Sequence, residues 1–573
     1  MRWFAKPDHL IAVLLFVLSM TVYAMTASPT ISFWDCAEFI ATAHTLGIPH
    51  QPGTPLYVLV GHVFSLLPLG IGVAHKINLM SGFFSALAVA FMYLTAVRIQ
   101  RTWSPDPAGE APSWIARVGA ASGALFFAFS TTFWNNAIEA EVYALSSFTL
   151  ALTAFISIVW YQMRSRAASA TLMLLIVYLM GMSIGFHLGS ILVFPGVFVL
   201  VMLARDKALK TFDLLLVGLV MASFVLSTMK WPDFLTIGLA IAAVLLAVWR
   251  SATWGSEDEI EQNRYFALIG IALFVVGISV HLFMMIRAHH DPLINQTDPT
   301  SFEALMSVLR REQYPPRSMF EREAPLLWQL GHMWGTSYWQ SGQVAGLQAV
   351  GYQQQFTFLG SGVSFADRFV PLALWLLGIF YQIRGNWRVG ASFLTTLIIN
   401  SLGLMLLLNF TDSEVRDRDY FYTGFYQFAA LFIALGVGGL LRGFWVGVAR
   451  DRAWLLKGAG AFLVLLPMLP VLAGFTGVAH QKWFEHDRSR NWIPYYYSRN
   501  ILDSVPENAI LCTYGDNDTF PLWYLQEVEG IRRDVTVIVT SYLNTDWYTL
   551  QLKQLTAPCE PGTDPASDLS LIH

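Results

Sequence analysis

Long apolar segments recur along most of this 573-residue chain. Each is roughly 17–25 residues long, and a helix of that length crosses the hydrocarbon core of a bilayer. Charged residues make up only 13% of the sequence, whereas soluble domains carry about 25%. The sequence therefore predicts an α-helical polytopic membrane protein with about thirteen transmembrane helices. We place them at residues 8–25, 77–98, 114–133, 141–161, 169–187, 188–204, 212–229, 232–249, 265–286, 369–383, 389–409, 421–441 and 455–477.

Basic residues follow every second predicted helix. If the N-terminus is cytoplasmic, all of these clusters face the cytoplasm, as the positive-inside rule requires. We therefore expect a multi-pass protein of the cell inner (plasma) membrane, with a cytoplasmic N-terminus and an extracytoplasmic C-terminus. The residues that carry this prediction are Arg98, Arg101, Arg164, Arg166, Arg205, Lys207, Lys210, Arg250, Arg384, Arg388, Arg442, Arg450 and Arg452.

The predicted topology divides the chain into two parts. Residues 1–477 form a transmembrane domain with outer loops at 26–76 and 287–368, and residues 478–573 form an extracytoplasmic α/β segment. Two predicted strands in this segment, at residues 509–514 and 534–541, flank a predicted helix, which indicates a β-α-β unit. Because two strands do not make a stable sheet alone, we expect this unit to dock on the membrane part or to belong to a truncated longer chain.

Charge placement narrows the function classes. The net charge of −4 and the lack of a basic run predict no nucleic-acid partner. No Asp or Glu lies near the centre of a predicted helix, although ion-coupled transporters usually place an ionisable relay there. Asn400, near the middle of its helix, is more typical of a hydrogen bond between helices than of a substrate site.

The first outer loop contains two acidic residues three positions apart, Asp35 and Glu38. On a helix they share one face, where burial can separate their pKa values so that one carboxylate acts as a base. The same spacing is also that of a capping box, in which Asp35 accepts a hydrogen bond from the Glu38 amide. His50, between two prolines, either orients a phosphate or shapes a turn.

Three further groups lie on the predicted outer side. Glu139 and Glu141 precede a helix, where acidic residues complement the helix dipole or join Asp35 in one pocket. Arg416 and Arg418 oppose the positive-inside bias, so they either pair with the neighbouring aspartates or bind a lipid phosphate. His187 is at a helix end, where a lone histidine is usually structural.

Four motifs together resemble a known family. These are Phe33-Trp34-Asp35-Cys36-Ala37-Glu38-Phe39, His50-Gln51-Pro52-Gly53-Thr54-Pro55-Leu56-Tyr57, Ala140-Glu141-Val142-Tyr143 and Arg416-Asp417-Arg418-Asp419-Tyr420-Phe421-Tyr422. They are similar to a bacterial family once known as a domain of unknown function and related to the transmembrane protein O-mannosyltransferases. The resemblance extends through most of the chain, including the run from Gly515 to Trp523.

The resemblance implies a GT-C-like fold and a sugar transfer on the non-cytoplasmic face. In such enzymes a sugar leaves a polyprenyl-phosphate carrier for a hydroxyl group in one inverting displacement. For this chain the resemblance implies mannose as the sugar and a protein Ser or Thr as the acceptor. The implied catalytic residues are Asp35, as general base, and Glu38. Donor or acceptor binding is implied for His50, Glu141, His187, Arg416 and Arg418.

Cofactor and acceptor remain open at this point. The phosphate leaving group does not require a metal, so we expect no obligatory cofactor and no metal site, although a divalent ion is chemically possible. The partners expected are a polyprenyl-phosphate-linked sugar, a protein or glycan acceptor and the lipid bilayer. The alternatives are the same chemistry on a lipid or envelope polysaccharide, and a non-enzymatic lipid or polymer transporter.

Overall fold

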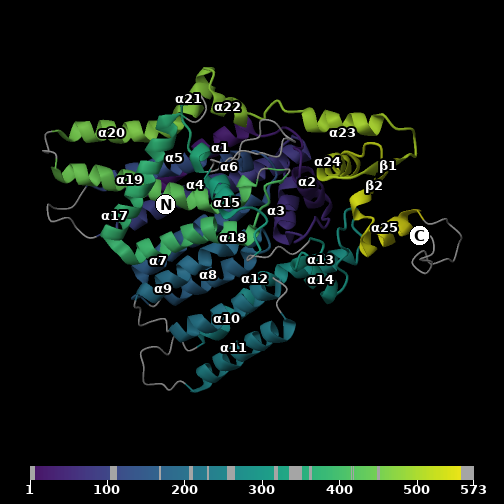
Figure 1. Cartoon of the computed structure of the whole chain (residues 1–573), viewed down its shortest axis with the longest axis horizontal. Coiled ribbons are helices and arrows are strands. Elements are labelled where there is room, and N and C mark those ends of the chain that lie inside the picture. Colours follow the sequence, from purple (N-terminus) through teal and green to yellow (C-terminus); the bar gives the residue numbers. More distant parts are fainter. Residues whose placement is uncertain are drawn as a thin grey trace.

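A computed structural model describes residues 7–103, 112–166, 169–204, 211–228, 232–253, 265–314, 321–334, 352–359, 364–414, 416, 418–447 and 452–556. Helices dominate it, and the longer ones run side by side (Figure 1). These are α1 (Pro7–Thr26), α4 (Val73–Gln100), α5 (Ser113–Ala128), α7 (Val142–Met163), α8 (Ser169–Ser183), α9 (Phe194–Ala204), α10 (Thr211–Thr228), α11 (Asp233–Thr253), α12 (Phe266–Ile278), α17 (Phe365–Ile398), α19 (Thr423–Gly447) and α20 (Ala453–Leu465).

Shorter helices connect or cover these long ones. They are α2 (Cys36–Thr45), α3 (Pro55–Ser65), α6 (Thr131–Ala137), α13 (Leu282–Ala288), α14 (Phe302–Leu309), α15 (Leu326–Trp334), α16 (Tyr352–Gln355), α18 (Leu404–Leu408), α21 (Leu469–Thr476) and α22 (Gln481–His486). The helix α3 has 11 residues, which is too short to cross a bilayer. In Figure 1, α2, α3, α13 and α14 lie toward the side of the molecule where the C-terminus is marked.

Membrane crossing is supported by the length and apolarity of the helices. Within the described residues, 8 helical stretches are long and apolar enough to span a bilayer, or 9 if α5 and α6, bent by 67°, form one span. Four shorter apolar helices accompany them, at Pro55–Ser65, Ser169–Ser183, Leu188–Ala204 and Thr211–Ser227. The polytopic helical fold class is therefore confirmed, whereas the count of thirteen spans, their orientation and the domain boundary at residue 477 stay predictions.

One of these stretches folds back on itself. Residues Phe365–Leu408 form a mostly apolar stretch of 44 residues. As one straight helix it would extend about 66 Å, about twice the thickness of a bilayer core. The backbone is not helical at Asn386 (φ −157°, ψ 89°). A Cβ placed on Gly390 would lie 3.4 Å from Cγ of Gln382, although eight residues separate them. The stretch therefore reverses at Asn386, between the two spans predicted there.

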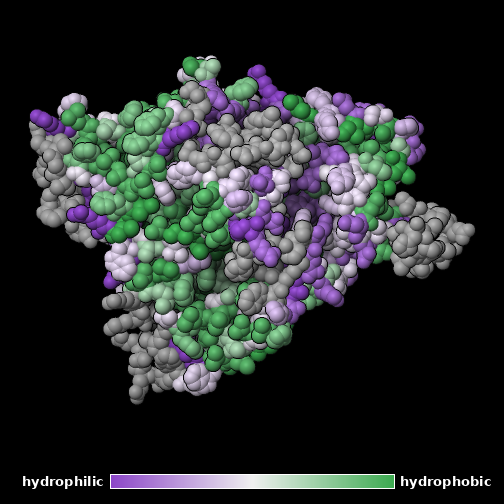
Figure 2. All heavy atoms as spheres, in the orientation of Figure 1, coloured by the Kyte–Doolittle hydropathy of each residue, from purple (hydrophilic) through white to green (hydrophobic). Residues whose placement is uncertain are grey.

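The bundle is apolar outside and holds polar groups inside. Large apolar side chains face outward, including Phe234 (76% exposed) and Trp454 (68%), and Figure 2 shows hydrophobic surface over the long helices. Asn400, in contrast, is buried and donates to the carbonyl of Leu192, 3.3 Å away. Its hydrogen bond between helices is the structural role that the sequence favours, and the outward apolar surface suits contact with lipid.

Glycines allow α17 and α19 to approach closely. A Cβ on Gly378 would lie 1.8 Å from the carbonyl oxygen of Phe432, and one on Gly436 would lie 1.9 Å from that of Leu374. Any side chain at these positions would force the two backbones apart. Small residues at helix interfaces are common in membranes because packing drives helix association there.

We expect Gly436→Val to lower the free energy of unfolding by about 1–3 kcal/mol or more, because the new side chain overpacks the contact. The matched control is Gly458→Val in α20, where a Cβ would meet nothing within 4 Å. Thermal unfolding in detergent, followed by size-exclusion chromatography, compares the two variants. Equal midpoints for Gly436→Val and wild type would contradict the close packing.

The last described part of the chain is an α/β segment. The parallel strands β1 (Ile510–Thr513) and β2 (Thr536–Val539) pair with Ile510 opposite Thr536, and α24 (Asp516–Glu527) connects them. The helices α23 (Ile493–Asp503) and α25 (Asp546–Thr556) flank this pair. The β-α-β unit thus forms as expected, and it docks: α24 packs against α2 through one shared apolar cluster that includes Phe39, Ile40, Phe520 and Leu525.

Candidate active site

The first outer loop presents Asp35 at the start of α2. Asp35 occupies the N-cap position, but its side chain makes no capping hydrogen bond. The capping-box interpretation is therefore wrong, and the Asp35 carboxylate is available for other contacts. The preceding residue, Trp34, has a φ of +64°, which is unusual for a bulky residue and costs roughly 1–3 kcal/mol.

Arg416 joins Asp35 to a second carboxylate. Its Nη1 atom donates to Oδ2 of Asp35 at 2.9 Å, and its Nη2 atom donates to Oε1 of Glu141 at 3.3 Å. The guanidinium also lies 5.0 Å from the ring centre of Trp34 and 4.4 Å from that of Tyr420. A planar cation with several N–H groups suits this bridge, which a lysine cannot reproduce. Three segments that are distant in sequence thus meet at one side chain.

Glu141 differs from Asp35 in its surroundings. It is the N-cap of α7, is only 3% exposed, and its Oε2 atom has no hydrogen-bond partner among the described residues. Burial raises the pKa of Glu141 to about 8, although Arg416 opposes the rise and Asp35 adds to it. Glu141 therefore holds a proton more readily than a free carboxyl group does, while its Oε1 atom accepts from Arg416.

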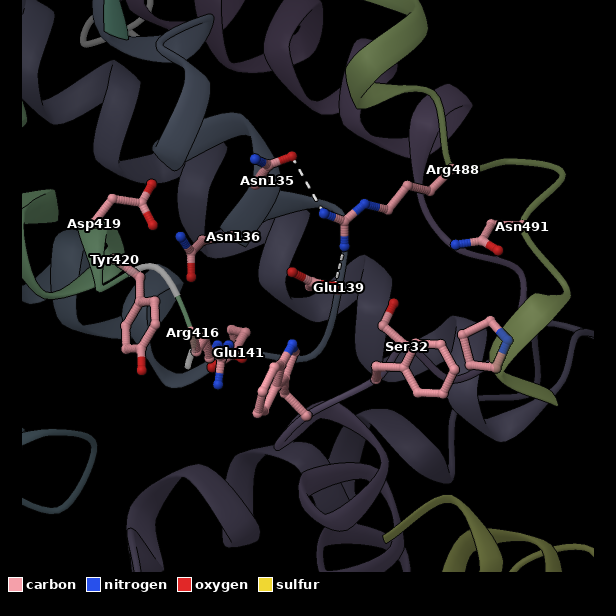
Figure 3. Close-up of a pocket in the computed structure, with 13 residues that line it drawn as sticks. Ser32, Asn135, Asn136, Glu139, Glu141, Arg416, Asp419, Tyr420, Arg488 and Asn491 are labelled. Atoms are coloured by element: carbon pink, nitrogen blue, oxygen red, sulfur yellow. Dashed lines mark hydrogen bonds and ion pairs between the residues drawn. The ribbon is translucent and has the colours of Figure 1, made fainter. Parts of the chain in front are cut away.

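An open cavity of about 450 Å³ adjoins this bridge. Figure 3 shows Arg416, Glu141 and Tyr420 on one side of it and Arg488 reaching across from the linker that follows α22. Arg488 pairs with Glu139 and donates to Oδ1 of Asn135 at 3.4 Å. The lining combines amide, hydroxyl, acidic and aromatic groups, namely Ser32, Phe33, Trp34, Asn135, Asn136, Glu139, Glu141, Arg416, Asp419, Tyr420, Arg488, Asn491 and Pro494.

Glu38 lies away from this cavity. Its side chain is fully buried and its Oε1 atom accepts from the His50 amide at 2.8 Å and from the Gln296 side chain. Its Oε2 atom is 2.5 Å from Nδ1 of His50. Burial lowers the pKa of His50, but the Glu38 carboxylate outweighs this and raises it to about 9. Burial in turn raises the pKa of Glu38, and His50 opposes that rise. Through Gln296 the pair links the first outer loop to the segment that follows α13.

The other two predicted binding residues lie nearby. His187 accepts a hydrogen bond at Nδ1 from the Gly189 amide at 3.0 Å, and its ring packs on Tyr143 at 4.8 Å. Because Nδ1 is an acceptor, the proton of the neutral ring is on Nε2, which is a donor. Arg418 donates to Glu414 at 3.0 Å and to the Tyr420 hydroxyl at 2.6 Å. Its ion-pair partner Glu414 lies four residues earlier in the chain.

Sequence reasoning missed several residues at the site. Gln296, Arg488 and Asn517 contact Glu38, Glu139 and the Trp34 amide. Each partner is hundreds of positions away, and single polar residues in loops carry no pattern that would reveal such contacts. Arg287 donates to the carbonyl of Leu46 at 2.7 Å and caps the end of α2.

Metal binding has no obvious centre in the described part of the chain. Within it, no three side chains of His, Cys, Asp or Glu are placed to hold a metal ion. The expectation that no metal is obligatory rests on the leaving-group chemistry and stays a prediction.

We expect the thermal stability of the protein to fall as the pH rises through the window between 6.5 and about 9. Because the pKa of His50 is higher in the folded than in the unfolded chain, the folded chain binds more protons in this window, and stability is lost as they leave. His50→Gln should flatten this part of the pH profile of the unfolding midpoint. An unchanged profile would show that the Glu38–His50 pair is not the titrating unit.

Two family models match this chain. One, described as the Protein O-mannosyl-transferase TMEM260 N-terminal domain, matches residues 35–210. The other, described as TMEM260-associated domain 2, matches residues 495–562. The matched ranges contain Asp35 and Glu141 in the first case and the β-α-β unit in the second.

Full-length relatives carry the same name. Protein O-mannosyl-transferase tmem260 of Dictyostelium discoideum is 23% identical over 572 residues, an alignment that covers 94% of this chain and 58% of the relative. The Mus musculus protein of that name is 22% identical over 558 residues, covering 94% and 63%. The chain thus spans about three fifths of the length of these relatives. It is related to them, which confirms the predicted relation to transmembrane protein O-mannosyltransferases.

Solved structures give more distant similarities. An Archaeoglobus fulgidus oligosaccharyltransferase in complex with Zn and sulfate aligns at 11% identity and a TM-score of 0.39, covering 89% of this chain and 57% of that one. ArnT from Cupriavidus metallidurans bound to undecaprenyl phosphate aligns at 10% identity and a TM-score of 0.46, covering 93% and 90%. Both TM-scores lie below 0.5.

Proposed function

We propose that this relative of the TMEM260 protein O-mannosyl-transferases is a membrane glycosyltransferase. It takes a sugar, mannose by its relatives' names, from a polyprenyl-phosphate donor and transfers it to a hydroxyl group, with protein Ser or Thr as the acceptor. The reaction takes place on the non-cytoplasmic face of the inner membrane. The observation that carries the proposal is the Asp35–Arg416–Glu141 bridge beside a polar cavity.

The proposed chemistry is one displacement at the anomeric carbon. The acceptor oxygen forms a bond to this carbon while the bond to the phosphate oxygen breaks, with inversion of configuration. Asp35 takes the proton of the attacking hydroxyl, and the phosphate leaves with its electron pair and negative charge. The leaving group is the polyprenyl phosphate, a phosphate monoester, and it is a good leaving group, so the reaction as proposed needs no metal ion.

Arg416 has two alternative partners in this proposal. While Arg416 holds Asp35 at 2.9 Å, the Oδ2 atom of Asp35 is occupied by this hydrogen bond. A donor phosphate offers the guanidinium a bidentate partner, so binding of the donor moves Arg416 toward the phosphate and frees Asp35. Arg418 and the Nε2–H of His187 are further donors for the phosphate or the sugar.

Glu38 and His50 support the loop in this proposal. The Glu38 carboxylate is fully buried and its two oxygens are occupied by His50 and Gln296. It therefore does not meet substrate in this conformation, and we assign it a positioning role in place of the catalytic one expected from the resemblance. The two contacts with His50 hold the Glu38 side chain in place.

The test is sugar transfer by the purified protein in detergent, with radiolabelled polyprenyl-phosphate mannose and a Ser/Thr peptide. We expect Asp35→Asn to lower the rate by about 100-fold or more, as loss of a general base does, while donor binding persists. Asp503→Asn, an exposed aspartate on α23, is the matched control. Parallel reactions with a chelator and with added divalent ions test the metal prediction.

Each outcome of this assay separates the alternatives. Full activity of folded Asp35→Asn would contradict Asp35 as the base. Donor binding without transfer to the peptide, but with transfer to lipid or polysaccharide acceptors, would keep the chemistry and change the acceptor. Wild-type protein that binds no donor and transfers nothing would contradict a glycosyltransferase and favour a transporter.

We expect Arg416→Lys to raise the KM for the donor by about 10-fold. A lysine ammonium is a compact point charge and cannot make the bidentate hydrogen bonds that the planar guanidinium makes to a phosphate or to two carboxyl groups. The matched control is Arg499→Lys, whose arginine forms an exposed pair with Asp503 on α23. Steady-state kinetics at varied donor concentration measure the effect. An unchanged KM in Arg416→Lys would show that Arg416 does not bind the donor.

A further inference from the structure

The docked α/β segment reaches the residue that precedes the candidate base. Oδ1 of Asn517, in the first turn of α24, accepts a hydrogen bond from the Trp34 amide at 2.6 Å. Trp34 holds the unfavourable φ of +64°, and its ring lies against the Arg416 guanidinium at 5.0 Å. Asn517 thus contacts the backbone whose conformation sets the directions of both the Trp34 ring and the Asp35 side chain.

The same face of α24 makes a second contact with the site. Phe520, three residues after Asn517, stacks on His50 with ring centres 6.5 Å apart and planes 7° apart. Residues three apart on a helix share a face. One face of α24 therefore contacts the first outer loop at two places, Trp34 and His50. Beneath it, α2 and α24 share a cluster of buried apolar side chains.

The turn before α24 is built so that Asn517 is available. The Asp518 carboxylate accepts from the amides of Tyr514 at 2.9 Å and Gly515 at 2.8 Å, and so caps its own helix. The Thr519 hydroxyl bonds that of Thr513 in β1 at 2.7 Å. These contacts anchor the turn within the segment and leave the Asn517 side chain to reach the outer loop.

Asp516, in the first turn of α24, interacts electrostatically with charged residues of the site. Burial raises the pKa of Asp516, and the nearby negative charge of Asp35 raises it further. The interaction of Asp516 with Asp35 is consistent with the hydrogen bond from the Trp34 amide to Asn517 and with the packing of α24 on α2.

We infer that the α/β segment is a working part of the active site, in which Asn517 is a positioning residue that fixes the loop carrying Asp35. Its catalytic consequence rests on the proposed function, whereas its effect on the loop does not. The region matched as TMEM260-associated domain 2 would then serve to hold the first outer loop in its reactive conformation.

The test measures the loop and the reaction separately in the full chain. Hydrogen–deuterium exchange of a peptide covering residues 31–37 reports on the Trp34 amide. It is measured in Asn517→Ala and in the isosteric Asn517→Asp, which keeps the acceptor oxygen. The control variant is Asn500→Ala. Asn500 is an exposed residue of α23 in the same segment. The transfer assay then gives kcat and KM for each variant.

We expect faster exchange at residues 31–37 in Asn517→Ala alone. In the same variant kcat should fall about 10-fold, the effect of roughly 1.4 kcal/mol in the transition state, while the KM for the donor changes less than about 3-fold. Asn517→Asp and Asn500→Ala should resemble wild type in both measurements.

Wild-type exchange in folded Asn517→Ala would overturn the inference. So would faster exchange with unchanged kcat, because the loop contact would then have no catalytic effect. If exchange responds as expected but even wild-type protein transfers no sugar, the proposed function fails while the positioning of the loop by Asn517 stands.

Discussion

The Arg416 guanidinium is the contact on which the arrangement of the site depends. It bonds Asp35 from the first outer loop and Glu141 from the start of α7, and two aromatic rings cover its faces. A mostly buried cation requires such partners, because removing one partner of a buried ion pair costs several kcal/mol. The three outer segments therefore hold each other, and a ligand that competes for Arg416 acts on all of them.

The membrane part supplies the frame for this contact. The long helices share one large apolar cluster, and the outer elements share a second one that joins α2, the start of α7 and α24. The site lies on the second cluster, so its geometry depends on how the loops and the α/β segment pack and not only on the helices beneath. The segment contributes Asn517 and Phe520 to that packing.

Sequence patterns alone predict the apolar helices, and they predict that the main polar residues of the site lie on the same side of the membrane. Apolar length predicts the helices, alternation of strand and turn residues predicts the β-α-β unit, and motif placement groups Asp35, Glu141 and Arg416 on one side. Their direct contact does not follow from the sequence, because a side-chain bridge over 381 residues depends on packing. The pairing of Glu38 with His50 and Gln296 also depends on packing, and it moves Glu38 away from the cavity.

Two contacts show why local sequence patterns gave a wrong prediction or none. The spacing of Asp35 and Glu38 fits a capping box, but the carboxylate of Asp35 bonds a charged guanidinium instead, which is a stronger partner than an amide. Asn517 lies in the first turn of α24, where no local pattern predicts that its side chain bonds the Trp34 amide 483 residues earlier. In both cases a tertiary contact outweighs the local alternative.

The most direct measurement is a cryo-EM structure of the protein with a polyprenyl phosphate bound. The account predicts that the guanidinium of Arg416 contacts the phosphate and has left Oδ2 of Asp35, which then faces the cavity. A phosphate bound elsewhere, with the 2.9 Å contact between Arg416 and Asp35 intact, would contradict it.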